Sequence, residues 1–195
     1  MPIFSGIFYL KQMNNVVTME LTNDRIFNGQ LTLLQPKNGY RIALDPIILS
    51  NFVQLQAGQS LLDVGCGVGA VSLIIKLKNP TARVTAIDVD ADLCDLCLCN
   101  AKKNSLEIDV VNSALENFSL PGQYFFDYVV TNPPFFRECS HRVSTAKRVA
   151  NFETIGLSEW ITLCLKKLKN RGIFCIIHRP ARLGEILTSL EQKTG

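Results

Sequence analysis

The hydrophobic pattern of the chain alternates between short apolar runs and longer stretches with helical spacing. Short runs of apolar and β-branched residues are typical of strands that are buried on both faces of a sheet. Such runs predict strands at 60–64, 83–88, 108–112, 125–131 and 173–177. Apolar residues recurring every three or four positions predict helices at 70–78, 91–104, 158–169 and 182–192. Strands that alternate with helices predict an α/β fold, a doubly wound parallel sheet covered on both faces.

The region before the first of these strands carries turn signals and a helix start. Asn28-Gly29 and Asn38-Gly39 bracket an apolar stretch and predict a small hairpin over 28–42, with 40–42 as the return strand. Asp45 and Pro46 then predict a helix over 47–53, with Asp45 as its N-cap. We treat 1–20 as an N-terminal extension and 21–195 as one domain, whose doubly wound core spans 44–195.

Composition narrows the class of protein. The 195 residues are 47% hydrophobic and 19% charged, which is typical of a packed domain rather than a disordered segment. The formal net charge of +3 permits a polyanionic partner without demanding one. The sequence has no apolar run long enough to cross a bilayer, and its first residues lack the pattern of a signal peptide. We therefore expect no membrane partner.

The cysteines indicate a reducing compartment. The sequence has seven, an odd number, and several lie inside predicted strands and helices, so we expect reduced thiols and a cytoplasmic location. Cys94, Cys97 and Cys99 lie close enough in sequence to suggest zinc ligands. On a helix, however, Cys97 and Cys99 face different sides, and no second pair or nearby histidine completes a site. We predict small buried thiols and no metal.

A short motif ends the predicted strand at 125–131. In Asn132-Pro133-Pro134-Phe135 the two prolines cannot continue a strand, so the chain turns at the carboxyl end, where ligands bind in open α/β sheets. The Asn132 amide oxygen and the nearby backbone carbonyls are acceptors suited to an amino group on an aromatic ring. Phe135 offers a flat face for stacking a base. The alternative is a proline turn with a core phenylalanine.

A glycine loop follows the predicted strand at 60–64. Gly65, Gly67 and Gly69 alternate with Cys66 and Val68, and Asp63 precedes them by two positions. This spacing differs from the dinucleotide fingerprint, and no lysine follows to hold a phosphate, so a pyrophosphate ligand is disfavoured. Asp88 ends the next strand, where an acid binds ribose hydroxyls in doubly wound folds.

Taken in order, the loop from Asp63, the acid at Asp88 and the Asn-Pro-Pro-Phe turn resemble class I S-adenosylmethionine-dependent methyltransferases. The Asn-Pro-Pro-aromatic form is similar to enzymes that methylate amino groups of adenine, guanine, cytosine or glutamine. The upstream residues, at 22–24, 29, 31–36, 39–41 and 44–49, resemble those of bacterial valine-tRNA adenine-N6 methyltransferases. Those enzymes modify the adenosine on the 3′ side of the anticodon.

The resemblance implies a Rossmann-like fold, S-adenosylmethionine as cofactor and tRNA as partner. It implies that the target adenine is held by Asn132, Pro133, Pro134 and Phe135. It implies that the cofactor is bound by Asp63, Gly65, Cys66, Gly67, Gly69, Asp88, Val89, Ser113 and Asn132, with Arg41 and Asp45 near its entrance. Chains of this family continue past the last helix into an antiparallel hairpin. We expect either a truncated chain at Gly195 or an uncovered sheet edge.

A cluster of cations follows the proline turn. Arg137, Arg142, Lys147 and Arg148 outnumber the one acid of that stretch, Glu138, and we predict that they bind RNA phosphates. A solvated loop is the alternative. Two other functions remain open: methylation of another amine, in ribosomal RNA guanine or protein glutamine, and a cofactor- or RNA-binding module without turnover.

Overall fold

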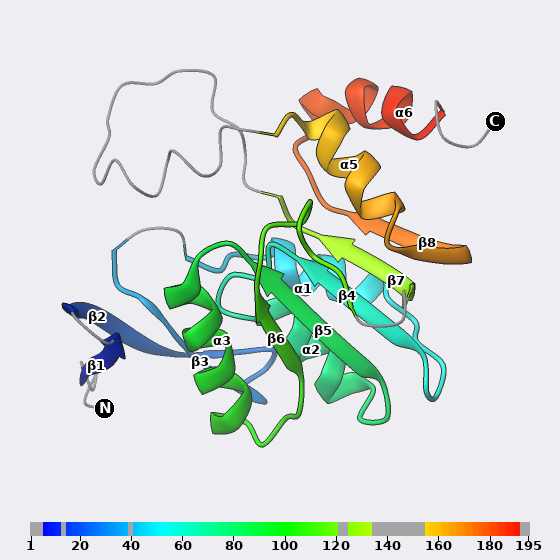
Figure 1. Cartoon of the computed structure of the whole chain (residues 1–195). Coiled ribbons are helices and arrows are strands. Elements are labelled where there is room, and N and C mark those ends of the chain that lie inside the picture. Colours follow the sequence, from blue (N-terminus) through cyan, green and yellow to red (C-terminus); the bar gives the residue numbers. More distant parts are fainter. Residues whose placement is uncertain (1–5, 13–14, 39–40, 121–124, 134–154, 192–195) are drawn as a thin grey trace.

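The described residues form two sheets, and helices lie on both sides of the larger one (Figure 1). The computed structural model describes residues 6–12, 15–38, 41–120, 125–133 and 155–191. The larger sheet has five strands, and each neighbouring pair runs parallel. In the order in which they lie side by side, its strands are β6 (Asp109–Asn112), β5 (Arg83–Asp88), β4 (Ser60–Val64), β7 (Phe126–Thr131) and β8 (Leu168–Ile176). The predicted parallel α/β sheet is therefore confirmed.

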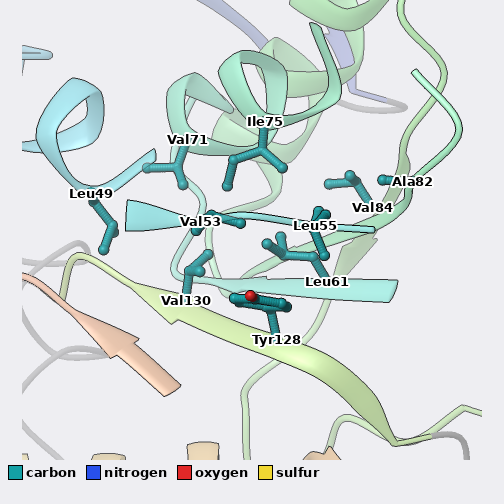
Figure 2. Close-up of a cluster of buried hydrophobic side chains, with 10 residues drawn as sticks. All are labelled: Leu49, Val53, Leu55, Leu61, Val71, Ile75, Ala82, Val84, Tyr128 and Val130. Carbon is teal, nitrogen blue, oxygen red and sulfur yellow. The ribbon is translucent and has the colours of Figure 1, made fainter. Parts of the chain in front are cut away.

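Helices cover both faces of this sheet, and the strands are apolar on both faces for that reason. The helices are α1 (Asp45–Phe52), α2 (Ala70–Lys78), α3 (Ala91–Lys103), α5 (Leu157–Leu165) and α6 (Leu183–Glu191), with a 3₁₀ turn at Pro180–Arg182. Leu61 of β4 packs with Leu49 of α1 and Ile75 of α2 (Figure 2). The next residue, Leu62, points to the other face and packs with Cys164 of α5. Within the described residues, no helix is long and apolar enough to span a membrane.

The small sheet is antiparallel and has the order β1 (Gly6–Gln12), β2 (Asn15–Ile26) and β3 (Leu31–Pro36). Its hairpin differs from the one predicted over 28–42, because β3 pairs with β2 and Arg41 and Ile42 lie in no strand. The turn at Asn28-Gly29, both with positive φ, joins β2 to β3. The second turn signal, near residue 38, instead begins the connection to α1.

Two asparagine side chains attach the small sheet to the core. The Asn100 amide accepts the Leu34 N–H at 2.7 Å and donates to the Leu34 carbonyl at 2.9 Å. Asn104 does the same for Thr32, at 2.9 and 2.8 Å. One helical turn of α3 rises by about 5.4 Å, close to the two-residue repeat of about 6.6 Å along β3, so the amides match the backbone of the strand. Asn100 also donates to the Val68 carbonyl in the glycine loop at 3.0 Å.

The predicted boundaries are wrong at the start of α1, at the end of α5 and at the start of β8. Asp45 is the first residue of α1 rather than its cap, because Leu44 occupies the cap position and Pro46 needs no hydrogen-bond partner in the first turn. The helix predicted over 158–169 ends at Leu165, and β8 begins before the predicted 173–177 strand. The pairing of β8 with β7 is interrupted by a bulge in which Arg171 has φ +64°. Residues 166–171 are mostly lysine, asparagine and arginine, which is typical of the last turn of a helix, and this explains the error.

Candidate active site

The glycine loop turns the chain from β4 into α2. Gly65, Gly67 and Gly69 have φ values of +72°, +55° and +89°, which residues with side chains rarely adopt. A Cβ atom on Gly69 would lie 2.5 Å from the Cys97 sulfur, so this glycine is also required by packing. A Cβ atom on Gly67 would meet nothing within 4 Å, and its backbone therefore faces open space that a ligand can approach.

Asp88 lies at the end of β5 and holds this loop. Its carboxylate accepts the Gly67 N–H at 2.8 Å and the Asp90 N–H at 2.9 Å. Burial raises the pKa of Asp88, against the two hydrogen bonds, which lower it. Val89 follows and is half-buried. The strand order thus brings together an acid and a glycine that are far apart in the sequence.

Asp63 lies beneath the loop. Its carboxylate accepts the N–H and the hydroxyl of Ser72, in the first turn of α2, at 3.1 and 2.6 Å. Burial raises the pKa of Asp63 to about 6, because the Ser72 hydrogen bonds offset only part of the desolvation and the negative charge of Asp88 adds to it. The structure therefore places Asp63 against the helix start.

The residues at the carboxyl end of β6 are hydrogen-bonded to the backbone of Asp88. The Ser113 N–H donates to the Asp88 carbonyl at 2.9 Å, and the Asn112 amide donates to the same oxygen at 3.0 Å. The Ser113 hydroxyl donates to the Ala114 carbonyl at 2.9 Å. Asn112 and Ser113 therefore lie at the carboxyl ends of the strands, next to Asp88, the predicted ribose ligand.

Three thiols meet behind the loop. The Cys66 thiol donates to the Gly67 carbonyl at 3.6 Å, and interaction with the neighbouring Cys94 and Cys97 thiols of α3, together with burial, raises the pKa of Cys66. All three are buried free thiols, whereas Cys99 is exposed, as the helical spacing predicts. No cluster of three or more His, Cys, Asp or Glu suited to a metal ion occurs in the described part of the chain.

Asn132 follows the carboxyl end of β7, at the same end of the sheet as the glycine loop. Thr131 is paired in register with Val64 of β4, and its hydroxyl donates to the Val64 carbonyl at 2.9 Å. Asn132 therefore leaves β7 where Gly65 leaves β4. Asn132 is half-buried and Pro133 is buried. The sheet thus brings the asparagine of the proline turn beside the glycine loop.

Trp160 of α5 lies beside both of these strand ends, and the sequence interpretation did not assign it to the site. Its indole N–H donates to the Thr131 hydroxyl at 3.1 Å. Its ring atoms lie 3.6 and 3.7 Å from where a Cβ atom on Gly65 would be. Trp160 is the only tryptophan in the chain, but its place on the apolar face of a helix looked like ordinary core packing.

Other predicted site residues lie elsewhere or outside the described parts. Arg41 is exposed and donates to Thr22 at 2.9 Å and to Asp24 at 2.8 Å, so it is held against β2. Burial raises the pKa of Asp24, but its hydrogen bonds and the charge of Arg41 outweigh this and leave it lowered. Asp45 begins α1. The residues outside the described ranges are Pro134, Phe135, Arg137, Arg142, Lys147 and Arg148.

Several curated proteins that carry one name are similar to this chain in sequence. The tRNA1(Val) (adenine(37)-N6)-methyltransferase of Shewanella baltica (strain OS155) is 26% identical over 157 residues, 76% of this chain and 66% of that protein. The one from Flavobacteriaceae bacterium (strain 3519-10) is 30% identical over 157 residues, 76% of this chain and 63% of that protein. The chain thus spans slightly less than two thirds of the length of these relatives.

Solved structures share the fold. A 16S rRNA N2 G1207 methyltransferase of T. thermophilus, in complex with AdoMet and guanosine, superimposes with a TM-score of 0.67 and 19% identity. The match covers 94% of this chain and 48% of that one. A precorrin-6y C5,15-methyltransferase of Geobacter metallireducens gives a TM-score of 0.55 and 19% identity, over 75% and 69% of the two chains. The family model for the methyltransferase small domain matches residues 45–154, more than half of the sequence, and the chain belongs to that family.

Proposed function

We propose that this chain transfers a methyl group from S-adenosylmethionine to the exocyclic N6 amine of an adenine in tRNA, in a valine tRNA next to the anticodon. Family membership supports methyl transfer, and the names of the curated relatives support the substrate. The observation that carries the proposal is the register of β4 and β7. Because Val64 pairs with Thr131, the glycine loop and Asn132 lie side by side at the carboxyl ends of β4 and β7.

The glycine loop fits the proposed cofactor. When bound, S-adenosylmethionine supplies a methyl group already activated on a sulfonium sulfur. The backbone at Gly67 faces open space, and Asp88 presents a carboxylate beside it. We assign the methionine part of the cofactor to the loop from Gly65 to Gly69 and the ribose to Asp88. Val89 and Ser113 would flank the cofactor on the side of β6.

The asparagine turn fits an amino group on a base. The Asn132 side-chain oxygen and the Asn132 and Pro133 backbone carbonyls would accept hydrogen bonds from the adenine N6 amine. Those bonds aim the nitrogen lone pair in one direction, and orientation of this kind can contribute about 7–11 kcal/mol to a transfer reaction. We assign stacking of the base to Phe135, with Pro134 holding the turn. A single-stranded anticodon loop makes the base accessible.

The cations after the turn would bind the RNA backbone. We assign phosphate contacts to Arg137, Arg142, Lys147 and Arg148, whose contribution would weaken as salt rises. A tRNA substrate also agrees with the cytoplasmic location predicted from the thiols.

The test is methylation of undermodified valine tRNA by the chain with labelled cofactor, followed by mass spectrometry of the nucleosides. We expect N6-methyladenosine from the wild type and a rate about 100-fold lower from Asn132→Ala. Asn170→Ala is the matched control, because Asn170 is an exposed asparagine near the amino end of β8, at the opposite end of the sheet. A methylated guanine as product, or equal rates for the wild type and Asn132→Ala, would contradict the proposal.

A further inference from the structure

The carboxyl ends of β4 and β7 are joined by two successive hydrogen bonds, and the first of these is donated by Trp160 of α5. The Trp160 indole donates to Thr131, and the Thr131 hydroxyl donates to the carbonyl of Val64. Thr131 is fully buried and directly precedes Asn132, while Val64 directly precedes Gly65. The chain of bonds therefore ends one residue away from each of the two proposed site elements.

Packing reinforces these bonds. The far edge of the Trp160 ring lies 3.6–3.7 Å from where a Cβ atom on Gly65 would be, so the ring occupies the space beside this glycine. The residues on either side of Trp160 along the apolar face of α5, Leu157, Ile161 and Cys164, are buried in the core. The helix is thus fixed, and the indole has little freedom to move away from the strand ends.

We infer that Trp160 is a positioning residue for methyl transfer: its indole sets the spacing between the glycine loop at Gly65 and the turn at Asn132. This inference rests on the proposed function. The loop would hold the methyl donor and the turn would hold the acceptor amine, so their spacing is the distance across which the methyl group passes. A small misplacement at that distance lowers the rate without a matching loss of cofactor affinity.

The test is a double-mutant cycle on kcat. Trp160→Phe keeps an aromatic ring and removes the N–H, and Thr131→Val keeps the shape and removes the hydroxyl. Each is expected to lower kcat about 10-fold while the Kd for S-adenosylhomocysteine, measured by calorimetry, changes less than about 2-fold. The double variant should be no slower than about the slower single one, because both break the same hydrogen bond. Thr131→Ser keeps the hydroxyl and should retain most of the rate.

Leu163→Ala is the control, because Leu163 packs against the same core cluster from the same helix. It should lower stability while leaving kcat near the wild-type value at a temperature where the protein is folded. Wild-type kcat in folded Trp160→Phe, or effects of the two variants that simply multiply, would overturn the positioning role while methyl transfer by the wild type stands. If the wild-type chain neither binds S-adenosylhomocysteine nor methylates tRNA, the proposed function falls and this inference falls with it.

Discussion

Aspartates at the carboxyl ends and at the amino ends of the five-stranded sheet have opposite pKa shifts. At the carboxyl ends, Asp63 and Asp88 accept hydrogen bonds from Ser72, Gly67 and Asp90. In the described residues neither forms an ion pair, and burial raises the pKa of both. Carboxylates of this kind keep their charge only at a cost, which is typical of sites that meet a ligand.

At the amino ends, Asp127 of β7 forms an ion pair with Lys169. Its carboxylate accepts the Ser60 N–H at 2.8 Å and the Ser60 hydroxyl at 2.9 Å, and Lys169 of the β8 bulge lies at 2.8 Å. Burial alone would raise the pKa of Asp127, but the hydrogen bonds from Lys169 and Ser60 outweigh it and lower the pKa to about 2. This acid is satisfied within the protein and acts on stability.

The difference matters because the amino end also carries a hollow of about 290 Å³, lined by Asp127, Lys169, Arg171 and neighbouring glutamines. A hollow of this size could admit a small ligand. Its acid is already paired, however, whereas the carboxyl end brings together Asp88, the glycine loop and Asn132. The chemistry at the strand ends therefore favours the carboxyl ends, rather than the hollow, as the candidate site, in agreement with the general behaviour of open α/β sheets.

The largest effect is expected at Asp88. In Asp88→Ala the Gly67 and Asp90 N–H groups lose a charged acceptor, and such bonds are worth about 1.5–3 kcal/mol each. We expect the affinity for S-adenosylhomocysteine to fall by about 100-fold or more in calorimetry. Asp127→Ala, at the other end of the sheet, should leave that affinity unchanged in folded protein. Similar affinities for the Asp88 and Asp127 variants would break the comparison.

Glycines at the two ends give the next contrast. Gly69→Ala adds a Cβ atom 2.5 Å from the Cys97 sulfur at φ +89°, whereas Gly58→Ala, before β4, meets nothing within 4 Å at φ +77°. We expect the free energy of unfolding, measured in urea, to fall by about 2–4 kcal/mol for Gly69→Ala and about 1–2 kcal/mol for Gly58→Ala. Adding Cys97→Ala to Gly69→Ala should recover part of the loss. Equal losses for the two glycine variants would show that backbone strain alone decides the cost.

Much of the sheet could be predicted because its signals are local. The strands at 60–64 and 83–88 and the helix at 70–78 match the structure, since buried parallel strands are apolar throughout and glycines mark the loop. The approach of Asp88 and Asn132 to the loop followed from parallel strand order, because carboxyl ends of such strands share an edge. A motif read at strand ends was therefore enough to place the candidate site.

Features with distant partners could not be predicted. Asn100 and Asn104 look like the polar face of an amphipathic helix, but their partner is the backbone of β3, more than 60 residues earlier. Trp160 looks like a core residue of α5, and only the sheet register shows that its indole reaches Thr131. Such contacts depend on how elements pack, and the periodicity of each element contains no information about its partner.

The smallest expected effect tests the opposite pKa shifts directly. The carboxyl of Asp63 has a pKa of about 6 in the folded protein against 3.8 unfolded, so the folded state binds its proton more tightly. As pH rises from about 4 to 6, Asp63 should therefore lower the free energy of unfolding, by on the order of 2 kcal/mol. Asp127 has the opposite sign, because its lowered pKa contributes stability above pH 3.8 that is lost as pH falls toward 2.

Urea unfolding of the wild type, Asp63→Asn and Asp127→Asn between pH 2 and 8 separates the two acids. The amide oxygen introduced by Asp63→Asn can still accept from Ser72, so this variant should lose the decline between pH 4 and 6 and keep the helix start. Asp127→Asn should leave that decline intact and remove stability only above about pH 4, where the wild-type carboxylate is charged. If both variants followed the wild-type profile in shape, the two ends of the sheet would not differ electrostatically. The assignment of the site to the carboxyl end would then rest on the register of β4 and β7 alone.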